Sequence, residues 1–264
     1  MGEVKPYTSY PGVNKLLDKF VSNVNNILKQ QLVSIYILGS LAVGDFNLNS
    51  SDIDFLVITE TNLKKEIITY LRNMHYELVS NNPIWGDRLE GSYISKDKLK
   101  EFQPPENPRP YIHKGQLKLL RYGNEWIIEK YVLKKHGMIL KGEDLRSEIK
   151  YIKQNDLKRV TLKILYNWWK PMINNKSKLY DDEYQAYAVL SMCRVIYTLH
   201  HGTVVSKPKA ARWVKKELSE KWDSLINDAL MWSKDMKFNR IDEIVKFIKY
   251  TIQYSQQFNN LLED

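Results

Sequence analysis

Two aspartates, Asp52 and Asp54, stand two residues apart at the start of a β-rich run that extends to residue 58. Side chains at positions i and i+2 of a strand point to the same face, so these two carboxylates would lie side by side and repel each other. A hard cation that prefers carboxylate and phosphate oxygens would relieve this repulsion, and Mg²⁺ is the cation that we expect. The spacing therefore predicts a magnesium site formed by Asp52 and Asp54.

A glycine–serine pair, Gly39–Ser40, ends the apolar run 33–38, which has the pattern of a buried strand. Glycine allows backbone N–H groups to approach a ligand closely, and Ser40 can act as the N-cap of a following helix. Because N–H groups at the start of a helix attract anions, we expect Gly39 and Ser40 to bind phosphate groups. A purely structural interpretation stays open, in which Gly39–Ser40 is only a turn and Asp52 only a cap.

The elements around these residues are predicted from the spacing of apolar side chains. Apolar residues recur at helical spacing over 13–28 and 62–74, and the pattern over 88–94 predicts a third strand. The segment 102–110 holds four of the nine prolines. It cannot be a regular helix, and we expect a surface connection there.

The pattern is helical from residue 124 almost to the end of the chain, with interruptions at Gly137, Gly202 and Pro208. We therefore expect an α+β fold with a small mixed sheet and helices in domain 1–150, and an α-helical bundle in domain 151–264. The helices predicted in this half are 126–136, 156–172, 182–200, 208–218, 221–233 and 241–262.

Composition limits the class of protein. The chain has 264 residues, a formal charge of +9 and one cysteine, Cys193. An internal disulfide and a cysteine-based zinc site are excluded, and a place in the core is expected for Cys193. A basic chain favours anionic partners such as ATP. The absence of a long apolar run and of a secretory leader predicts a cytoplasmic protein without membrane spans.

The ordered series of strand, Gly39–Ser40, Gly44, spacer and Asp52-x-Asp54 resembles the signature of the polymerase-β-like nucleotidyltransferases. The resemblance implies three carboxylates around Mg²⁺, the third of which would be Glu90 on the next predicted strand. In the streptomycin and spectinomycin adenylyltransferases the matching glutamate is the base that deprotonates the acceptor hydroxyl. Glu90 can also be read as a solvated strand residue.

A second resemblance lies far along the chain. Leu190 and Arg194 in a helical run, followed by Thr203, Ser206–Lys207–Pro208 and Ala210–Ala211–Arg212–Trp213, are similar to the C-terminal domain of those adenylyltransferases. The resemblance implies that Lys207 contacts the nucleotide phosphates. The residues agree, because Ser206 can cap a helix with Pro208 in its first turn and so place Lys207 at the positive helix end. A solvated basic face is the alternative.

The same family binds its cationic substrate with aromatic and acidic side chains of the helical domain. Trp169, Asp182 and Glu183 supply both kinds here and are the expected substrate residues, although the aspartate can cap a helix and the tryptophan can be core. The expected activity is Mg²⁺-dependent transfer of AMP from ATP to a hydroxyl of spectinomycin or streptomycin, with resistance as the result. We expect a monomer.

Two other functions stay open. The first is a nucleotidyltransferase that acts on tRNA or protein, although nucleic acid is disfavoured because no basic stripe with interleaved aromatics is found. The second is a non-catalytic nucleotide-binding regulator, which the intact set Asp52, Asp54 and Glu90 disfavours.

Overall fold

The computed structural model of the protein describes residues 6–218 and 220–262, which divide into two compact units. Unit 1 contains the chain up to Phe46, Ser51–Gly123 and Val132–Lys150. Unit 2 contains Asn47–Ser50, Asn124–Tyr131 and the chain from Tyr151 on. The helix α4 (Glu125–His136) begins in unit 2 and ends in unit 1.

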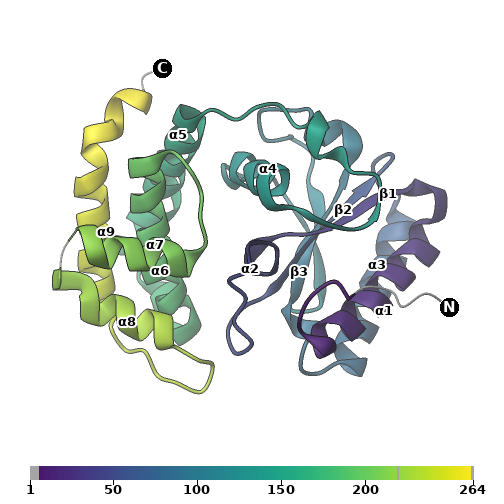
Figure 1. The fold of residues 1–264 in the computed structure, drawn as a ribbon, viewed down its shortest axis with the longest axis horizontal. Coiled ribbons are helices and arrows are strands. Elements are labelled where there is room, and N and C mark those ends of the chain that lie inside the picture. Colours follow the sequence, from purple (N-terminus) through teal and green to yellow (C-terminus); the bar gives the residue numbers. More distant parts are fainter. Residues whose placement is uncertain (1–5, 219, 263–264) are drawn as a thin grey trace. The chain divides into compact units, whose positions relative to one another are not determined.

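Within the described residues, unit 1 forms a six-stranded mixed sheet (Figure 1). Its spatial order is β5-β4-β3-β2-β1-β6; β2 and β3 are parallel, and the other neighbouring pairs are antiparallel. The strands are β1 (Leu32–Ile37), β2 (Ile53–Thr59), β3 (Leu89–Ser95), β4 (Arg109–His113), β5 (Gln116–Leu120) and β6 (Met138–Gly142).

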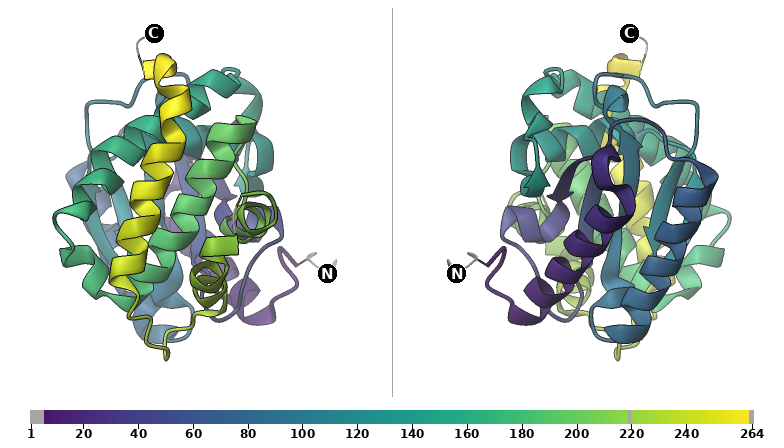
Figure 2. Two further views of the ribbon diagram at one scale, coloured as in Figure 1. Left: turned by 90° about the vertical axis from the view of Figure 1, so that its left-hand side faces the viewer. Right: turned by 90° about the vertical axis from the view of Figure 1, so that its right-hand side faces the viewer.

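Two long helices, α1 (Pro11–Leu28) and α3 (Lys65–Asn81), cover one face of this sheet, as Figure 2 shows. The strand side chains that join their apolar core include Ile37, Phe55 and Leu89. Because side chains alternate along a strand, the residues between them point to the opposite face. Asp54 and Glu90 are among these, so the carboxylates lie on the face of the sheet opposite α1 and α3.

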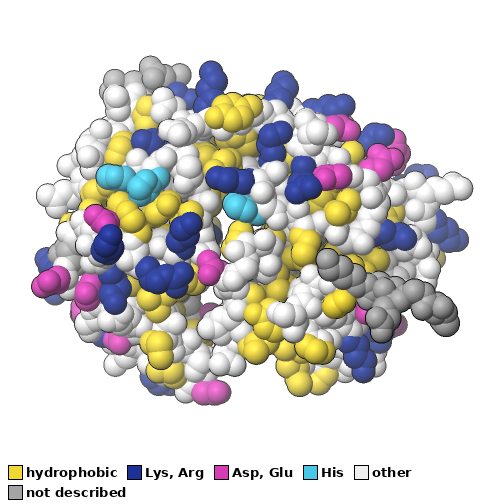
Figure 3. All heavy atoms as spheres, in the orientation of Figure 1, with side chains coloured by type: hydrophobic (Ala, Val, Ile, Leu, Met, Phe, Trp, Pro, Cys, Tyr) yellow, Lys and Arg dark blue, Asp and Glu magenta, His cyan; other side chains and the backbone are white. Residues whose placement is uncertain are grey.

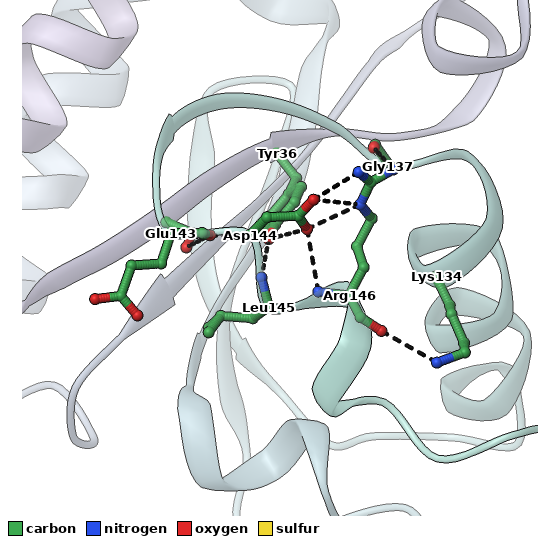
Figure 4. Close-up of polar contacts among 8 residues, drawn as sticks. Tyr36, Lys134, Gly137, Glu143, Asp144, Leu145 and Arg146 are labelled. Carbon is green, nitrogen blue, oxygen red and sulfur yellow. Dashed lines mark hydrogen bonds and ion pairs between the residues drawn. The ribbon is translucent and has the colours of Figure 1, made fainter.

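The segment after β6 is fastened to β1 by the polar network of Figure 4. The Tyr36 hydroxyl accepts the Leu145 N–H at 2.7 Å and donates to the Glu143 carbonyl at 3.0 Å. The Arg146 guanidinium donates to the Asp144 carboxylate at 2.6 Å and to the Gly137 carbonyl at 3.1 Å. The hydrogen bond from Arg146 lowers the pKa of Asp144 to about 2, so this carboxylate is ionised at neutral pH.

Unit 2 is helical, with α6 at its centre in contact with its neighbours α5, α7, α8 and α9. The buried side chains of α6 include Cys193, which is fully enclosed, and burial raises the pKa of its thiol. Cys193 is therefore a core residue, as expected from the sequence. The helices are α5 (Gln154–Ile164), α6 (Asp182–His201), α7 (Lys207–Glu217), α8 (Asp223–Met231) and α9 (Ile241–Ser255).

The α+β fold class predicted from the sequence is confirmed, but several predicted elements are wrong. Residues 109–110 were assigned to a proline-rich connection but begin β4. The region from residue 124 on was predicted to be helical, but it contains the strand β6. The single helix predicted over 156–172 breaks after Ile164 into a π-helical turn (Leu165–Trp169) and a 3-10 turn (Lys170–Ile173). Pro171, in the first positions of the 3-10 turn, lacks the N–H that a continuing α-helix would use there.

None of the helices in residues 6–218 and 220–262 combines the length and apolar composition that crossing a membrane requires. Lys and Arg side chains are spread among acidic and hydrophobic ones on the face drawn in Figure 3.

Candidate active site

Asp54 and Glu90 are direct neighbours across two parallel strands. The register of β2 and β3 pairs Ile53 with Leu89 and Asp54 with Glu90. Register partners on adjacent strands point to the same face and lie about 4.8 Å apart in the backbone. Both side chains are half-buried. The two carboxylates therefore come from one row across the sheet, as the sequence predicted.

Gly39 packs directly against Asp54. A Cβ atom added to Gly39 would lie 1.7 Å from Asp54 Oδ2, and the φ angle of Gly39 is +58°. Any other residue would both collide with the carboxylate and adopt a strained backbone. The Leu38 N–H also donates to the Asp54 carbonyl at 2.8 Å, so β1, the glycine turn and the aspartate form one rigid corner.

The prediction that Ser40 caps the following helix is wrong. The short helix α2 (Gly39–Val43) already includes Ser40, its N-cap is Leu38, and the cap uses no side chain. The helix starts two residues earlier than an N-cap at Ser40 would place it, and its first residue, Gly39, has a positive φ angle that glycine tolerates. Gly44, the second glycine of the motif, ends α2 in the left-handed conformation.

Asp52 lies just before β2, in a loop that Arg88 secures. Arg88 is buried, and its Nε atom donates to the Ser51 carbonyl at 2.9 Å. Its guanidinium lies 4.7 Å from the centre of the Trp85 ring. Burial lowers the pKa of Arg88, and the negative charges of Asp52 and Asp87 oppose this shift. Arg88 therefore fixes the backbone beside Asp52 and places a positive charge near it.

Glu90 is held by two side chains of β4. The Tyr111 hydroxyl donates to Glu90 Oε1, and His113 Nδ1 lies 3.2 Å from Glu90 Oε2. The Glu90 side chain is 23% exposed. Both of its oxygens thus have a partner on the β4 side of the sheet, away from β2.

The donor atoms fit a magnesium ion only in part. In the part of the chain that the structure describes, no group of three or more His, Cys, Asp or Glu side chains is arranged to hold a metal. The carboxylates of Asp52 and Asp54 remain the hard oxygen donors that Mg²⁺ prefers, whereas Glu90 is engaged with Tyr111 and His113. A metal site on Asp52 and Asp54, with Glu90 as a third ligand, stays a prediction.

Lys207 is the first residue of α7 in unit 2. Ser206 caps this helix by accepting the Lys209 N–H at 3.3 Å, with Pro208 in the first turn, as the sequence predicted. Lys207 Nζ lies 4.3 Å from the centre of the Tyr187 ring. The ammonium group is therefore held at the positive end of α7, where an anionic ligand is favoured.

The expected substrate residues of unit 2 do not form one group. Trp169 is 2% exposed in the helical core, so its assignment to a substrate surface needs correction; its neighbour Trp168 is 47% exposed. Consecutive side chains of a helical turn point in different directions, so only one of the two rings faces the core.

Asp182 anchors the segment before α9. Its carboxylate accepts the Phe238 N–H at 3.0 Å and pairs with Lys237 at 3.1 Å, and the backbone bond lowers its pKa. The preceding Asp181 caps α6 by accepting the Tyr184 N–H at 2.7 Å. Glu183 follows in the first turn of α6 and is half-buried. A substrate role for Asp182 and Glu183 stays a prediction.

Sequence reasoning missed Arg88, Tyr111 and His113. Tyr111 and His113 alternate with apolar residues over 109–113, which is the pattern of a strand, but Pro108 and Pro110 concealed it. No motif in the sequence marked Arg88 as a site residue, because its contact with the Ser51 carbonyl forms only in the folded loop.

Comparisons with known proteins agree with this geometry. Residues 19–165 match the family described as nucleotidyltransferase domain, and residues 150–257 match the aminoglycoside adenylyltransferase, C-terminal domain. A similar solved structure is spectinomycin adenyltransferase AAD(9) from Enterococcus faecialis with ATP and spectinomycin, at 20% identity and a TM-score of 0.71 over 92% of this chain and 98% of that chain. The comparison with curated protein sequences gave no match.

The first of these families covers more than half of the chain. The second covers the C-terminal part and is described as the C-terminal domain of aminoglycoside adenylyltransferase. The chain therefore belongs to the nucleotidyltransferase domain family and is an enzyme, a nucleotidyltransferase whose C-terminal part matches the aminoglycoside adenylyltransferase C-terminal domain.

Proposed function

We propose that this enzyme transfers AMP from ATP to a hydroxyl group of an aminoglycoside-type antibiotic, spectinomycin or streptomycin, and so confers resistance. The observation that carries the proposal is the row formed by Gly39, in the turn after β1, and by Asp54 and Glu90 on the face of the sheet opposite α1 and α3. The match of residues 150–257 to the C-terminal domain of aminoglycoside adenylyltransferases supports the choice of acceptor. A cytoplasmic location, where ATP is available, fits this activity.

We assign a task to each residue of the row and to its neighbours Asp52 and Ser40. Asp52 and Asp54 would hold Mg²⁺, which when bound offsets the negative charge of the triphosphate. The backbone around Gly39 and Ser40 binds phosphate oxygens, because glycine permits their close approach. Glu90 accepts the proton of the acceptor hydroxyl.

The reaction is a single displacement at the α-phosphorus of ATP. The acceptor oxygen forms a bond to this phosphorus while its proton passes to Glu90. The bond between the α-phosphorus and the oxygen that bridges it to the β-phosphate breaks, and pyrophosphate leaves with that electron pair. No covalent enzyme intermediate is required. A positioned base of this kind contributes about 10²- to 10⁴-fold to the rate.

In this proposal, residues of unit 2 also contribute to binding the nucleotide and the acceptor. Lys207 binds a phosphate group of ATP, which its place at the start of α7 supports. Asp182 and Glu183, in the first turn of α6, supply negative charge for a cationic amino sugar. Trp168, which is exposed and donates its Nε1–H to the Tyr184 hydroxyl at 3.0 Å, replaces Trp169 as the aromatic candidate.

The test is a panel of acceptors incubated with ATP and Mg²⁺. Spectinomycin, streptomycin, other aminoglycosides, bulk tRNA and a protein mixture are each assayed for pyrophosphate release and for a product that carries one added AMP. We expect both signals with spectinomycin or streptomycin. Product on tRNA or protein alone would contradict the choice of acceptor, and ATP binding without pyrophosphate from any acceptor would favour a regulator.

A further inference from the structure

Glu90, Tyr111 and His113 form one polar group on the strands β3 and β4, in which both carboxylate oxygens of Glu90 are occupied. We propose that Tyr111 and His113 are positioning residues that orient the Glu90 carboxylate for proton transfer from the acceptor hydroxyl. This inference rests on the proposed function, in which Glu90 is the base. It assigns a role in the reaction to two residues outside the motif that carries the metal.

The strand register explains why these residues meet. β3 and β4 are antiparallel and pair Ser92 with Tyr111 and Gly91 with Ile112. One more step of the same register places His113 opposite Glu90. Tyr111 and His113 are two residues apart and so share a face of β4. His113 thus reaches Glu90 as a direct cross-strand neighbour and Tyr111 as a diagonal one.

The backbone of β4 is well suited to hold this arrangement. His113 pairs with Gln116 on β5, and the two residues between them, Lys114 and Gly115, have φ angles of 48° and 70°. Positive φ angles at both central positions define a tight hairpin turn whose twist matches that of the strands. The turn fixes the register of His113, although its side chain is 55% exposed.

Two donors on two oxygens determine the orientation of a carboxylate. The hydroxyl of Tyr111 donates to Oε1, and the tautomer of His113 that carries hydrogen on Nδ1 donates to Oε2. Together they prevent rotation of the carboxylate about its terminal bond and leave the remaining lone pairs in a fixed direction. A general base gains from such fixed geometry, because a displacement of about 1 Å can cost about 100-fold in rate.

The experiment compares steady-state kinetics of the full-length wild type with Tyr111→Phe, His113→Ala and His113→Asn. The first two variants each lose one donor, and we expect kcat to fall by about ten- to a hundred-fold while KM for ATP changes by less than about threefold. Asparagine places an amide N–H where Nδ1–H stood, so His113→Asn should recover most of the lost kcat.

Matched controls are Tyr76→Phe, an exposed tyrosine on α3, and His200→Ala, an exposed histidine whose Nδ1 contacts the Tyr254 hydroxyl at 3.1 Å. Neither should change kcat. Circular dichroism and thermal melting check that each variant is folded.

The outcomes separate this inference from the proposed function. A wild-type enzyme that transfers AMP, with wild-type kcat in Tyr111→Phe and His113→Ala, overturns the inference alone. So does a His113→Asn variant that is folded and as slow as His113→Ala, because the donated hydrogen bond would then not be the cause. A wild type that transfers AMP to no acceptor overturns the proposed function, and the inference with it.

Discussion

Asp54 on β2 and Glu90 on β3 occupy the same register position of two parallel strands, on the face of the sheet opposite α1 and α3. This relationship places an oxygen-rich pair at one end of two adjacent strands. The glycine turn after β1 closes against Asp54 from the other side. The glycine turn, Asp54 and Glu90 therefore follow one another across three neighbouring strands, in the places that the proposal assigns to phosphate binding, the metal and the base.

Gly39 is predicted to be indispensable because of its contact with Asp54. In Gly39→Ala the new Cβ would lie 1.7 Å from Asp54 Oδ2, so the carboxylate must move. We expect transfer activity to fall by at least about 100-fold. The measurement is kcat/KM with ATP at saturating acceptor.

Gly44→Ala is the matched control for this effect. Gly44 has a φ angle of +79°, but a Cβ there meets no atom within 4 Å. Both variants should lose about 1–2 kcal/mol of unfolding free energy from the left-handed backbone. Gly39→Ala should in addition lose transfer activity, whereas Gly44→Ala should keep it. Equal activity losses in the two variants would show that backbone strain, not the contact with Asp54, is responsible.

Glu90→Gln is expected to separate binding from catalysis. The amide keeps the size of the side chain but cannot accept a proton, so turnover should fall by about 10²- to 10⁴-fold. The affinity for ATP, measured by calorimetry, should be retained. Glu77→Gln on the exposed side of α3 is the control. Unchanged turnover in folded Glu90→Gln would exclude Glu90 as the base.

Lys207→Ala is predicted to weaken ATP binding. Loss of one charge-assisted contact with phosphate should raise the dissociation constant for ATP by about ten- to a hundred-fold. Lys209→Ala, two residues later on the exposed side of α7, should leave it unchanged. Equal affinities in the two variants would assign Lys207 to a solvated basic face.

His75 makes stability depend on pH. Its ring is 1% exposed, stacks on Phe55 and bonds to the Tyr93 hydroxyl at 2.7 Å. Burial lowers its pKa to about 3. In the unfolded chain His75 binds a proton below about pH 6.5, whereas in the folded protein it stays neutral down to about pH 3. The free energy of unfolding therefore falls as the pH drops from about 6.5 to about 3.

The slope of this decline should reach at most about 1.4 kcal/mol per pH unit for one proton. Urea unfolding at pH 7, 6 and 5, before the carboxylates titrate, measures it. The His75→Gln variant should have a flatter profile over the same range. Parallel profiles would mean that His75 does not control the acid sensitivity.

Much of this fold follows from local patterns in the sequence. Alternation along β2 and the glycine after β1 were enough to predict the corner that holds Asp54, since both signals are local. β4 was missed because prolines rarely occur in strands. Pro110 is tolerated there because β4 pairs with β3 only at Tyr111 and Ile112, so no hydrogen bond to β3 requires its missing N–H.

The site was harder to predict than the fold because its contacts are long-range. The approach of His113 to Glu90 depends on the register between β3 and β4, which no local pattern encodes. In the same way, the sequence could not tell which of two adjacent tryptophans faces solvent, because a π-helical turn changes the periodicity.

The most direct test of the central claim follows the α-phosphate of ATP in the double variant Asp52→Asn, Asp54→Asn. Wild type and variant are incubated with ATP labelled at the α-phosphorus, Mg²⁺, and spectinomycin or streptomycin, and the label is located by chromatography and mass spectrometry. The account predicts that the label moves to the antibiotic with the wild type and stays in ATP with the folded double variant. Transfer by the double variant at the wild-type rate would contradict it.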